Sequence, residues 1–174
     1  MRLASILLAM SAIVALGSPA SAQTAQEEVK ATFIYRFVSY IGWPPASFPD
    51  AGLPVQLCVI GADPLARTLE RATMAQRVGA RHFEVRRIGD ADDIDACHVL
   101  YVVGDRTAAA LRAARRRAIL SITSGGSERG VIHFTIVDAR VRFYIDDALA
   151  EEGGLTIDPR LLNLALSVRR RSAS

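Results

Sequence analysis

The stretch VQLCVIGADP at residues 55–64 decides the fold class. Its first six residues, Val55–Ile60, form a short apolar run of the length typical of a buried strand. Asp63 and Pro64 then predict a helix start, with Asp63 as the N-cap, because aspartate caps helices and proline is tolerated at the first helical position. A strand followed directly by a helix is the repeating unit of α/β proteins with parallel sheets.

Similar patterns continue along the chain after this unit. Three further strands and one helix are predicted, at His82–Ile88, Cys97–Val103, Ala118–Thr123 and Thr107–Arg117. Val131–Val137 and Val141–Ile145 alternate apolar and polar side chains around a tight turn, which predicts an antiparallel hairpin. The sequence therefore predicts a single α/β domain, with a mainly parallel sheet flanked by helices on both faces and an antiparallel hairpin.

A helix is also predicted near each end of this domain. The first spans Gln26–Ile41, with large apolar residues at helical spacing from Val29 onward, and the Gly42-Trp43-Pro44-Pro45 segment ends it. The last begins at Asp158-Pro159, and we expect it to bury Leu161, Leu162, Leu164, Ala165 and Val168. The first helix carries more large side chains than one buried face requires, so some of them are candidates for contact with a partner.

The N-terminus has the pattern of a secretory signal peptide. Arg2 precedes an apolar run, Leu3–Leu16, and Ala20-Ser21-Ala22 provides a cleavage site of small residues. The apolar run is shorter than the roughly 20 residues that a membrane-spanning helix needs. We therefore expect residues 1–22 to be a signal peptide cut after Ala22, and residues 23–174 to be an exported domain that is not embedded in a membrane.

Charge argues against nucleic acid as a partner. The formal net charge is only +3, and the basic residues are scattered or form short clusters such as Arg115-Arg116-Arg117. No aromatic residues alternate with them, as a base-stacking surface requires.

The chain has two cysteines, Cys58 and Cys97. An even number of cysteines in an exported protein favours a disulfide. Both lie in apolar runs that are predicted to be buried strands, and neighbouring strands would place them within bonding reach. Two separate buried thiols are the alternative, because cysteine tolerates burial well.

The sequence contains no convincing catalytic or metal-binding motif. Ser127 lies in a glycine-rich segment, but a nucleophile elbow needs glycine two residues later, where Arg129 stands. His82, His98 and His133 show no paired metal-ligand spacing, and the acidic stretch 90–95 lacks the glycine and glutamate of a calcium loop. We expect no catalytic residue, no metal and no cofactor.

Two segments are candidates for binding instead. Trp43 and Phe48 lie in a proline-rich loop, where they either cover the core or anchor a partner protein, since aromatic residues dominate interface hot spots. Backbone amides of the Ser124–Gly130 loop are the alternative site, for a small anion or nucleotide. Among a protein-binding module, a small-molecule-binding module and a hydrolase, the sequence favours the protein-binding module.

Several stretches together resemble the YfiR/HmsC family of periplasmic regulators. In chain order they are TFIYRFVSYIGWP at 32–44, LCVIG at 57–61 with Asp63-Pro64, CHVLY at 97–101, VRFYID at 141–146, and Leu155 through LLNLA at 161–165. Each is weakly specific alone, but they follow one another over nearly the whole domain. Two departures are Asp146, where the family commonly has Asn, and the lack of a second cysteine pair that some relatives carry.

The resemblance implies a periplasmic, non-enzymatic α/β protein. Members repress the periplasmic sensor domain of an inner-membrane diguanylate cyclase, which lowers cyclic di-GMP signalling and biofilm formation. An OmpA-like outer-membrane lipoprotein can sequester the repressor, and members often dimerise, so a homodimer is expected. The resemblance also implies that Cys58 and Cys97 pair with each other.

Overall fold

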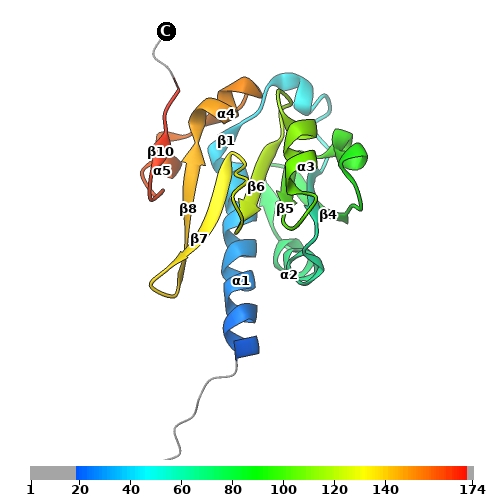
Figure 1. The fold of residues 1–174 in the computed structure, drawn as a ribbon. Helices are drawn as coiled ribbons and strands as arrows, with labels where there is room; N and C mark the ends of the chain where they lie inside the picture. The colour runs from blue at the N-terminus through cyan, green and yellow to red at the C-terminus, as the bar shows by residue number, and fades with distance from the viewer. Residues whose placement is uncertain (1–18, 172–174) are drawn as a thin grey trace, which may run out of the picture.

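The computed structural model describes residues 19–171, apart from the side chains of residues 19–21 and Asp92, and an eight-stranded sheet forms its centre (Figure 1). In chain order its strands are β2 (Val55–Ile60), β3 (Arg77–Val78), β4 (Arg81–Arg87), β5 (Val99–Val102), β6 (Leu120–Ser124), β7 (Ile132–Val137), β8 (Arg140–Asp146) and β10 (Val168–Arg169). The order across the sheet is β10-β8-β7-β6-β5-β2-β4-β3. Strands β4, β2, β5, β6 and β7 are parallel, and β8 returns antiparallel to β7. The predicted mainly parallel sheet with an antiparallel hairpin is confirmed.

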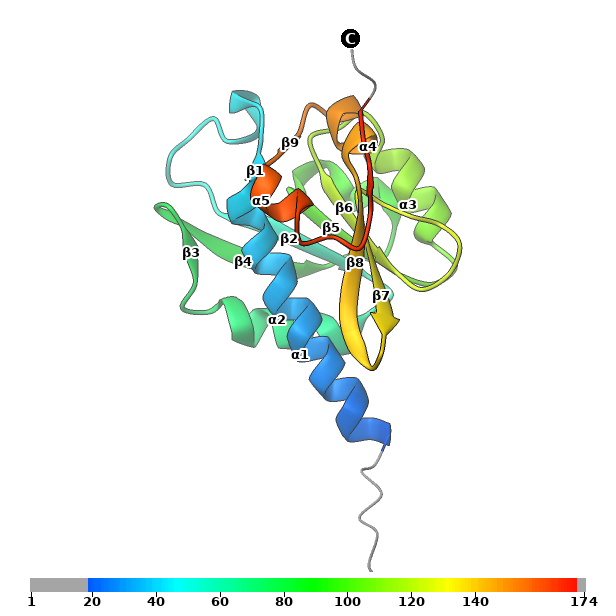
Figure 2. The same ribbon diagram turned by 90° about the vertical axis from the view of Figure 1, so that its left-hand side faces the viewer.

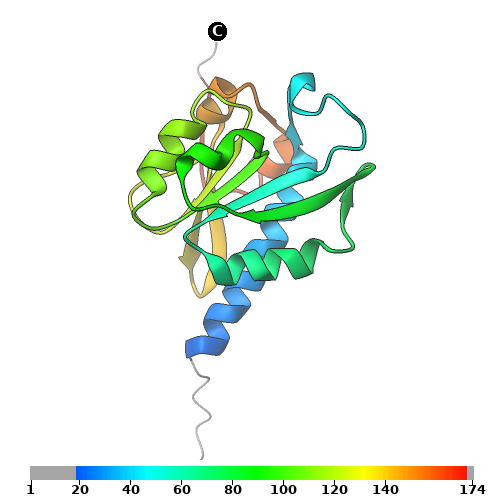
Figure 3. The same cartoon turned by 90° about the vertical axis from the view of Figure 1, so that its right-hand side faces the viewer.

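Helices cover both faces of this sheet, as predicted. The helices are α1 (Pro19–Phe37), α2 (Asp63–Thr73), α3 (Thr107–Ala114), α4 (Asp147–Glu152) and α5 (Pro159–Leu162), with 3-10 turns η1 (Val38–Tyr40), η2 (Pro45–Ser47) and η3 (Ala91–Ala96). Helices α1 and α2 lie on one face (Figure 2), and α3 with η3 lies on the other (Figure 3). Two short strands, β1 (Ile41–Gly42) and β9 (Thr156–Ile157), form a separate antiparallel pair.

The central strands β2 and β5 are apolar apart from Gln56, because both of their faces are buried. In β2, Leu57 and Val59 pack on the side of α1 and α2, whereas Cys58 and Ile60 pack on the side of α3 and η3. Each face thus has its own core, and the disulfide belongs to the smaller one.

A cluster of four phenylalanines attaches α1 to the sheet. Phe33 and Phe37 come from α1, Phe134 from β7 and Phe143 from β8. The Phe37 ring centroid lies 5.0 Å from that of Phe143 and 6.0 Å from that of Phe134. Aromatic pairs at these distances are stabilising beyond their buried area. The cluster therefore fixes the position of α1 across the parallel strands and the hairpin.

The first helix is shorter at its C-terminal end than predicted. It ends at Phe37, and Ile41 belongs to β1, where it pairs with Ile157. Gly42 allows this pairing, because a Cβ at that position would lie 2.3 Å from the Thr156 Oγ1 atom. Val29, expected in the apolar stripe, is 42% exposed. At the start of α2, Ala62 rather than Asp63 occupies the N-cap position.

The predicted last helix is wrong beyond Leu162. Helix α5 ends there, and Leu164, expected in the core, is 60% exposed. Val168 instead pairs with Ile145 in β10, at the open edge of β8. An edge strand presents unpaired backbone groups, and satisfying them outweighs the helical preference of this leucine-rich segment. The start of the helix is confirmed, since Asp158 accepts a 2.8 Å hydrogen bond from the backbone of Arg160.

The predicted signal peptide lies mostly outside the described residues. Its charged and apolar regions, residues 2–16, belong to the part of the chain that the structure does not describe. The expected cleavage point after Ala22 falls near the start of α1. No helix within residues 19–171 is both long and apolar enough to cross a membrane.

Candidate partner-binding surface

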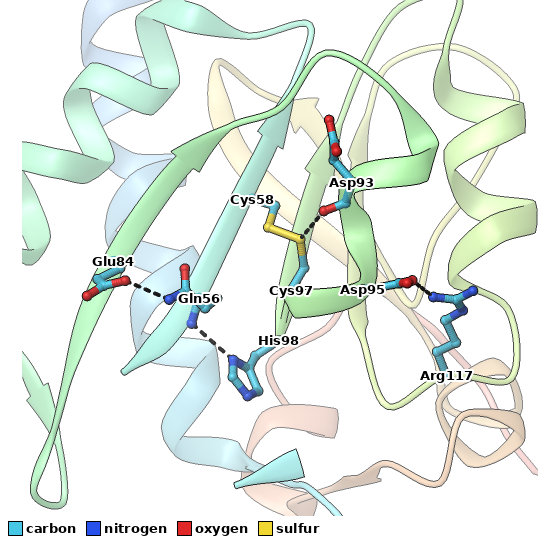
Figure 4. The surroundings of a disulfide bond; sticks show 8 residues. All are labelled: Gln56, Cys58, Glu84, Asp93, Asp95, Cys97, His98 and Arg117. Atoms are coloured by element: carbon cyan, nitrogen blue, oxygen red, sulfur yellow. Dashed lines mark hydrogen bonds and ion pairs between the residues drawn. A yellow bond between two sulfur atoms is a disulfide. The ribbon is translucent and has the colours of Figure 1, made fainter. Parts of the chain in front are cut away.

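Cys58 and Cys97 form a disulfide, which confirms the predicted pairing and excludes two separate thiols (Figure 4). Cys58 lies in the middle of β2, and Cys97 lies two residues before β5, the neighbouring parallel strand. Their Cα atoms are 5.8 Å apart, and both residues are buried. The disulfide therefore joins two adjacent strands inside the core beneath α3 and η3.

His98, the residue after Cys97, connects the disulfide to the Trp43–Pro54 loop, which we call the aromatic loop. Its Nδ1 atom accepts a 3.0 Å hydrogen bond from the Gln56 backbone, and its Nε2 atom lies 2.9 Å from the Ser47 carbonyl oxygen. A backbone amide can only donate and a carbonyl can only accept, so these contacts require the neutral imidazole with its proton on Nε2. Burial lowers the pKa of His98, and the positive charge of Arg81 lowers it further, whereas the bond to Ser47 acts in the opposite direction.

Phe48 is held between two side chains from different elements. Its ring stacks on that of His98, with centroids 4.1 Å apart and an interplanar angle of 4°. The Arg81 guanidinium carbon lies 4.3 Å from the Phe48 ring centroid. Arg81 also donates hydrogen bonds of 2.7 and 2.9 Å to the carbonyl oxygens of Asp50 and Leu53. Cation–π contact and hydrogen bonds from one arginine thus order the loop.

Trp43 packs against the edge of Phe48, with ring centroids 5.9 Å apart. Both side chains are half-buried, and both pack against the larger core. The Trp43 Nε1–H group is buried but has no hydrogen-bond acceptor in the described part of the chain. The structure therefore brings the two predicted residues into one aromatic group beside the disulfide, and their binding of a partner stays a prediction.

We expect acid to loosen this loop before the fold as a whole is lost. Protonating His98 places an N–H group at Nδ1, opposite the Gln56 amide that donates to it. Because the folded state lowers the pKa of His98, the loop is fully stable above the ordinary histidine pKa of 6.5. Its stability falls as the pH drops below 6.5, until His98 is also protonated in the folded protein. Emission of Trp43, the only tryptophan, should report the change.

Two alanine variants test this pH dependence. His98→Ala should abolish the pH-dependent shift of Trp43 emission, whereas His82→Ala should retain it, because His82 is exposed on β4. His133 also has a pKa lowered by burial, but it lies on β7 and hydrogen-bonds to Thr123. It therefore affects overall stability rather than the loop. An unchanged emission shift in His98→Ala would contradict the assignment.

A second exposed surface lies along α1 and the neighbouring elements. Large apolar side chains that are at least partly exposed lie here, on α1, the β7–β8 hairpin and the segment after α5: Val29, Phe33, Ile136, Leu164 and Leu166. We call this set the α1 face. Figures 1 and 2 show α1 and the hairpin side by side, and in Figure 2 the segment after α5 passes between α1 and β8.

A shallow hollow of about 440 Å³ marks the α1 face and is lined by Val29, Phe33 and three polar neighbours on α1. Another, of about 430 Å³, is lined by Val137 and Leu166 together with Arg140 and Arg142. Arg140 and Arg142 alternate along β8 with the core residues that pack toward α1, so this second hollow opens on the other side of the hairpin. Apolar residues rimmed by charged ones are typical of protein-binding surfaces.

The remaining residues singled out in the sequence do not meet at one site. Ser127 is exposed in the loop between β6 and β7, and no hydrogen bond joins it to a histidine or an acid within residues 19–171. His82, His98 and His133 lie on different parts of the sheet, and no group of potential metal ligands is found among the described residues. Asp90 caps η3 by accepting a hydrogen bond from the Ala91 backbone.

Asp146 and Lys30 have structural roles that the sequence did not reveal. Asp146 caps α4 by accepting a 2.9 Å hydrogen bond from Leu149, and its carboxylate also pairs with Arg169 of β10. Its charge thus helps to attach β10. Lys30 donates a 2.9 Å hydrogen bond to the Ser124 hydroxyl, which joins α1 to the end of β6. The Asp146–Arg169 and Lys30–Ser124 contacts do not follow from local sequence patterns, because their partners are far apart in the chain.

The fold and these surfaces define a class of protein: a disulfide-bonded α/β domain with an ordered aromatic loop and an exposed apolar face. Comparison with known families makes this specific, since a sequence model of YfiR/HmsC-like proteins matches residues 27–166. The chain belongs to the YfiR/HmsC-like family. No match was found among curated proteins. Membership supports, at the level of the family, a periplasmic regulator of a diguanylate cyclase.

Proposed function

We propose that this protein binds the periplasmic sensor domain of an inner-membrane diguanylate cyclase and represses the enzyme. Repression lowers cyclic di-GMP synthesis and biofilm formation. The observation that carries the proposal is the family match over residues 27–166, which includes the aromatic loop, the disulfide and all residues of the α1 face. A signal peptide over residues 1–22, cut after Ala22, delivers the domain 23–174 to the periplasm.

Repression of this kind needs no chemistry by the repressor. A ligand shifts a two-state equilibrium by its difference in affinity for the two states. Binding the inactive state of the sensor about 100-fold more tightly than the active state corresponds to about 2.7 kcal/mol of coupling. An OmpA-like outer-membrane lipoprotein that takes up the same surface would relieve repression by competition. A homodimer remains an expectation of the family resemblance.

Two features of the structure support protein binding at the α1 face and the aromatic loop. The α1 face exposes apolar side chains that a partner can bury at about 25 cal/mol per Å². The buried Trp43 N–H group has no acceptor among residues 19–171, and an unsatisfied buried donor costs about 1–3 kcal/mol. A partner that supplies an acceptor, or draws the loop outward, recovers this energy. The free loop is therefore suited to rearrange on binding.

A charge on the α1 face should separate repressor from cyclase. Val29 is 42% exposed on α1, so Val29→Asp leaves the core intact while introducing a carboxylate into an apolar contact. We expect at least tenfold weaker capture of the cyclase from solubilised inner membranes. Cyclic di-GMP should then rise in cells that carry this variant in place of the native protein.

Met74→Asp is the matched control. Met74 is 84% exposed at the end of α2, outside the α1 face, so the same apolar-to-acidic change there should leave capture and cyclic di-GMP unchanged. Trp43→Ala and Phe48→Ala should also weaken capture, and their melting temperatures show whether the fold has been disturbed. Equal capture by the native protein and Val29→Asp would exclude the α1 face. Failure of the native protein to retain any cyclase would refute the proposed function.

A further inference from the structure

A basic hollow lies on the side of the molecule opposite α1. Its volume is about 330 Å³, and its walls are the C-terminal end of α3, the loop between β6 and β7, the start of α4, and β10. Figure 3 shows α3, with the loop passing beside it. Six of the lining side chains are arginines, namely Arg112, Arg115, Arg116, Arg117, Arg129 and Arg169. We call it the arginine hollow.

Half of these arginines are neutralised by carboxylates. Arg115 pairs with Glu152, Arg117 with Asp95, and Arg169 with Asp146. Arg112, Arg116 and Arg129 form no ion pair within the described part of the chain, although Arg129 lies over the Tyr144 ring at 5.0 Å. Glu128 also lines the hollow. Three unpaired cations beside one further carboxylate leave an excess of positive charge.

The chemistry of the walls indicates what this charge would bind. Guanidinium groups present a planar fork of N–H donors that matches phosphate and carboxylate oxygens. Most of the other lining side chains are apolar, among them Leu111, Ile119 and Leu149, and the remainder are Ser121, Glu128 and Asp146. The volume is at the lower end of the range of small-molecule sites, too small for a large cofactor. An anionic group joined to a compact apolar body fits both parts of the lining.

Arg116 occupies an unfavourable backbone conformation. Helix α3 ends at Ala114, and Arg116 has a φ of 60° in the turn that follows. This left-handed conformation is costly for residues other than glycine. Arg116→Gly therefore removes the guanidinium while relieving the backbone, so a loss of binding in this variant would not be explained by a loss of stability.

We propose that the arginine hollow binds a small organic anion, with a phosphate or carboxylate group held by Arg112, Arg116 and Arg129 and an apolar body against the opposite wall. This differs from an anion site made of loop backbone amides, because the donors are guanidinium groups. The proposal is independent of cyclase repression, since the hollow and the α1 face share no residue.

Calorimetric titration of the purified chain tests the site with defined probes. Phenyl phosphate represents the phosphate source and benzoate the carboxylate source, whereas inorganic phosphate and benzyl alcohol each carry one half of the proposed chemistry. At least one of the two complete probes should bind more tightly than both half-probes. Arg112→Ala and Arg116→Gly should each weaken that binding at least tenfold, and Arg116→Gly should keep or raise the melting temperature.

Arg67→Ala provides the control, because Arg67 is an exposed arginine on α2, away from the hollow. It should bind the probes as the native chain does. The proposal is overturned if neither complete probe exceeds benzyl alcohol, if inorganic phosphate binds as tightly as phenyl phosphate, or if Arg67→Ala weakens binding as much as Arg116→Gly. Tighter binding of hexaglutamate would also overturn it, in favour of an acidic polypeptide.

Discussion

Replacing both Cys58 and Cys97 by alanine is expected to lower the free energy of unfolding by about 4 kcal/mol. The disulfide closes a segment with a sequence separation of 39 residues, and the chain-entropy model assigns about this value to a loop of that length. For a domain of this size the melting temperature should fall by on the order of 10 °C. Reduction of the native protein with a thiol should have a similar effect.

Differential scanning calorimetry with and without reductant measures this effect. The double alanine variant serves as the control, because its melting temperature should not respond to reductant. The disulfide should also influence the aromatic loop, since Cys97 precedes His98, which contacts Ser47 and stacks on Phe48. Trp43 emission should therefore change on reduction at temperatures where the protein remains folded. A melting temperature that is the same in both redox states would contradict a stabilising role for the disulfide.

The second large effect is expected at Phe134. Its side chain is fully buried on β7 between the two α1 phenylalanines and Phe143. Phe134→Ala removes a ring from three aromatic contacts and leaves a cavity, for which about 3–5 kcal/mol is the usual cost. This is a large fraction of the roughly 5–15 kcal/mol that stabilises a typical domain. Urea denaturation should show a much lower midpoint.

Ile136→Ala is the matched control for Phe134→Ala. Ile136 lies two residues further along β7 and is 43% exposed near the hairpin, so its truncation should cost well under 1 kcal/mol. The dependence of the unfolding free energy on urea should be similar for both variants, which indicates that the same surface is exposed on unfolding. Equal midpoints for Phe134→Ala and the native protein would mean that the aromatic cluster does not hold α1 to the sheet.

The first of these effects links stability to function. The disulfide, His98 and Phe48 form a continuous series of contacts from the core to the aromatic loop. A change of redox state at Cys58 and Cys97 would therefore alter the loop as well as the stability of the domain. If the loop contributes to cyclase binding, repression should depend on the redox state of the periplasm.

Local patterns determined the strands, the hairpin and the α/β class, because the period of apolar residues depends on which faces of an element are buried. The sequence by itself also shows that two cysteines are available for pairing. It contains none of the residue spacings that the known catalytic motifs require. The family resemblance rests on such stretches too, and the match over residues 27–166 confirms it.

Only the tertiary structure decided where the C-terminal segment lies and which side chains meet. The leucine-rich stretch after Leu162 has a helical pattern, but the open edge of β8 pairs with it as β10. Arg81 and His98 enclose Phe48, and three arginines that form no ion pair with any described residue line the arginine hollow. These contacts join residues that are distant in the chain. Their energies arise only when the strands assemble, so no local pattern of the sequence encodes them.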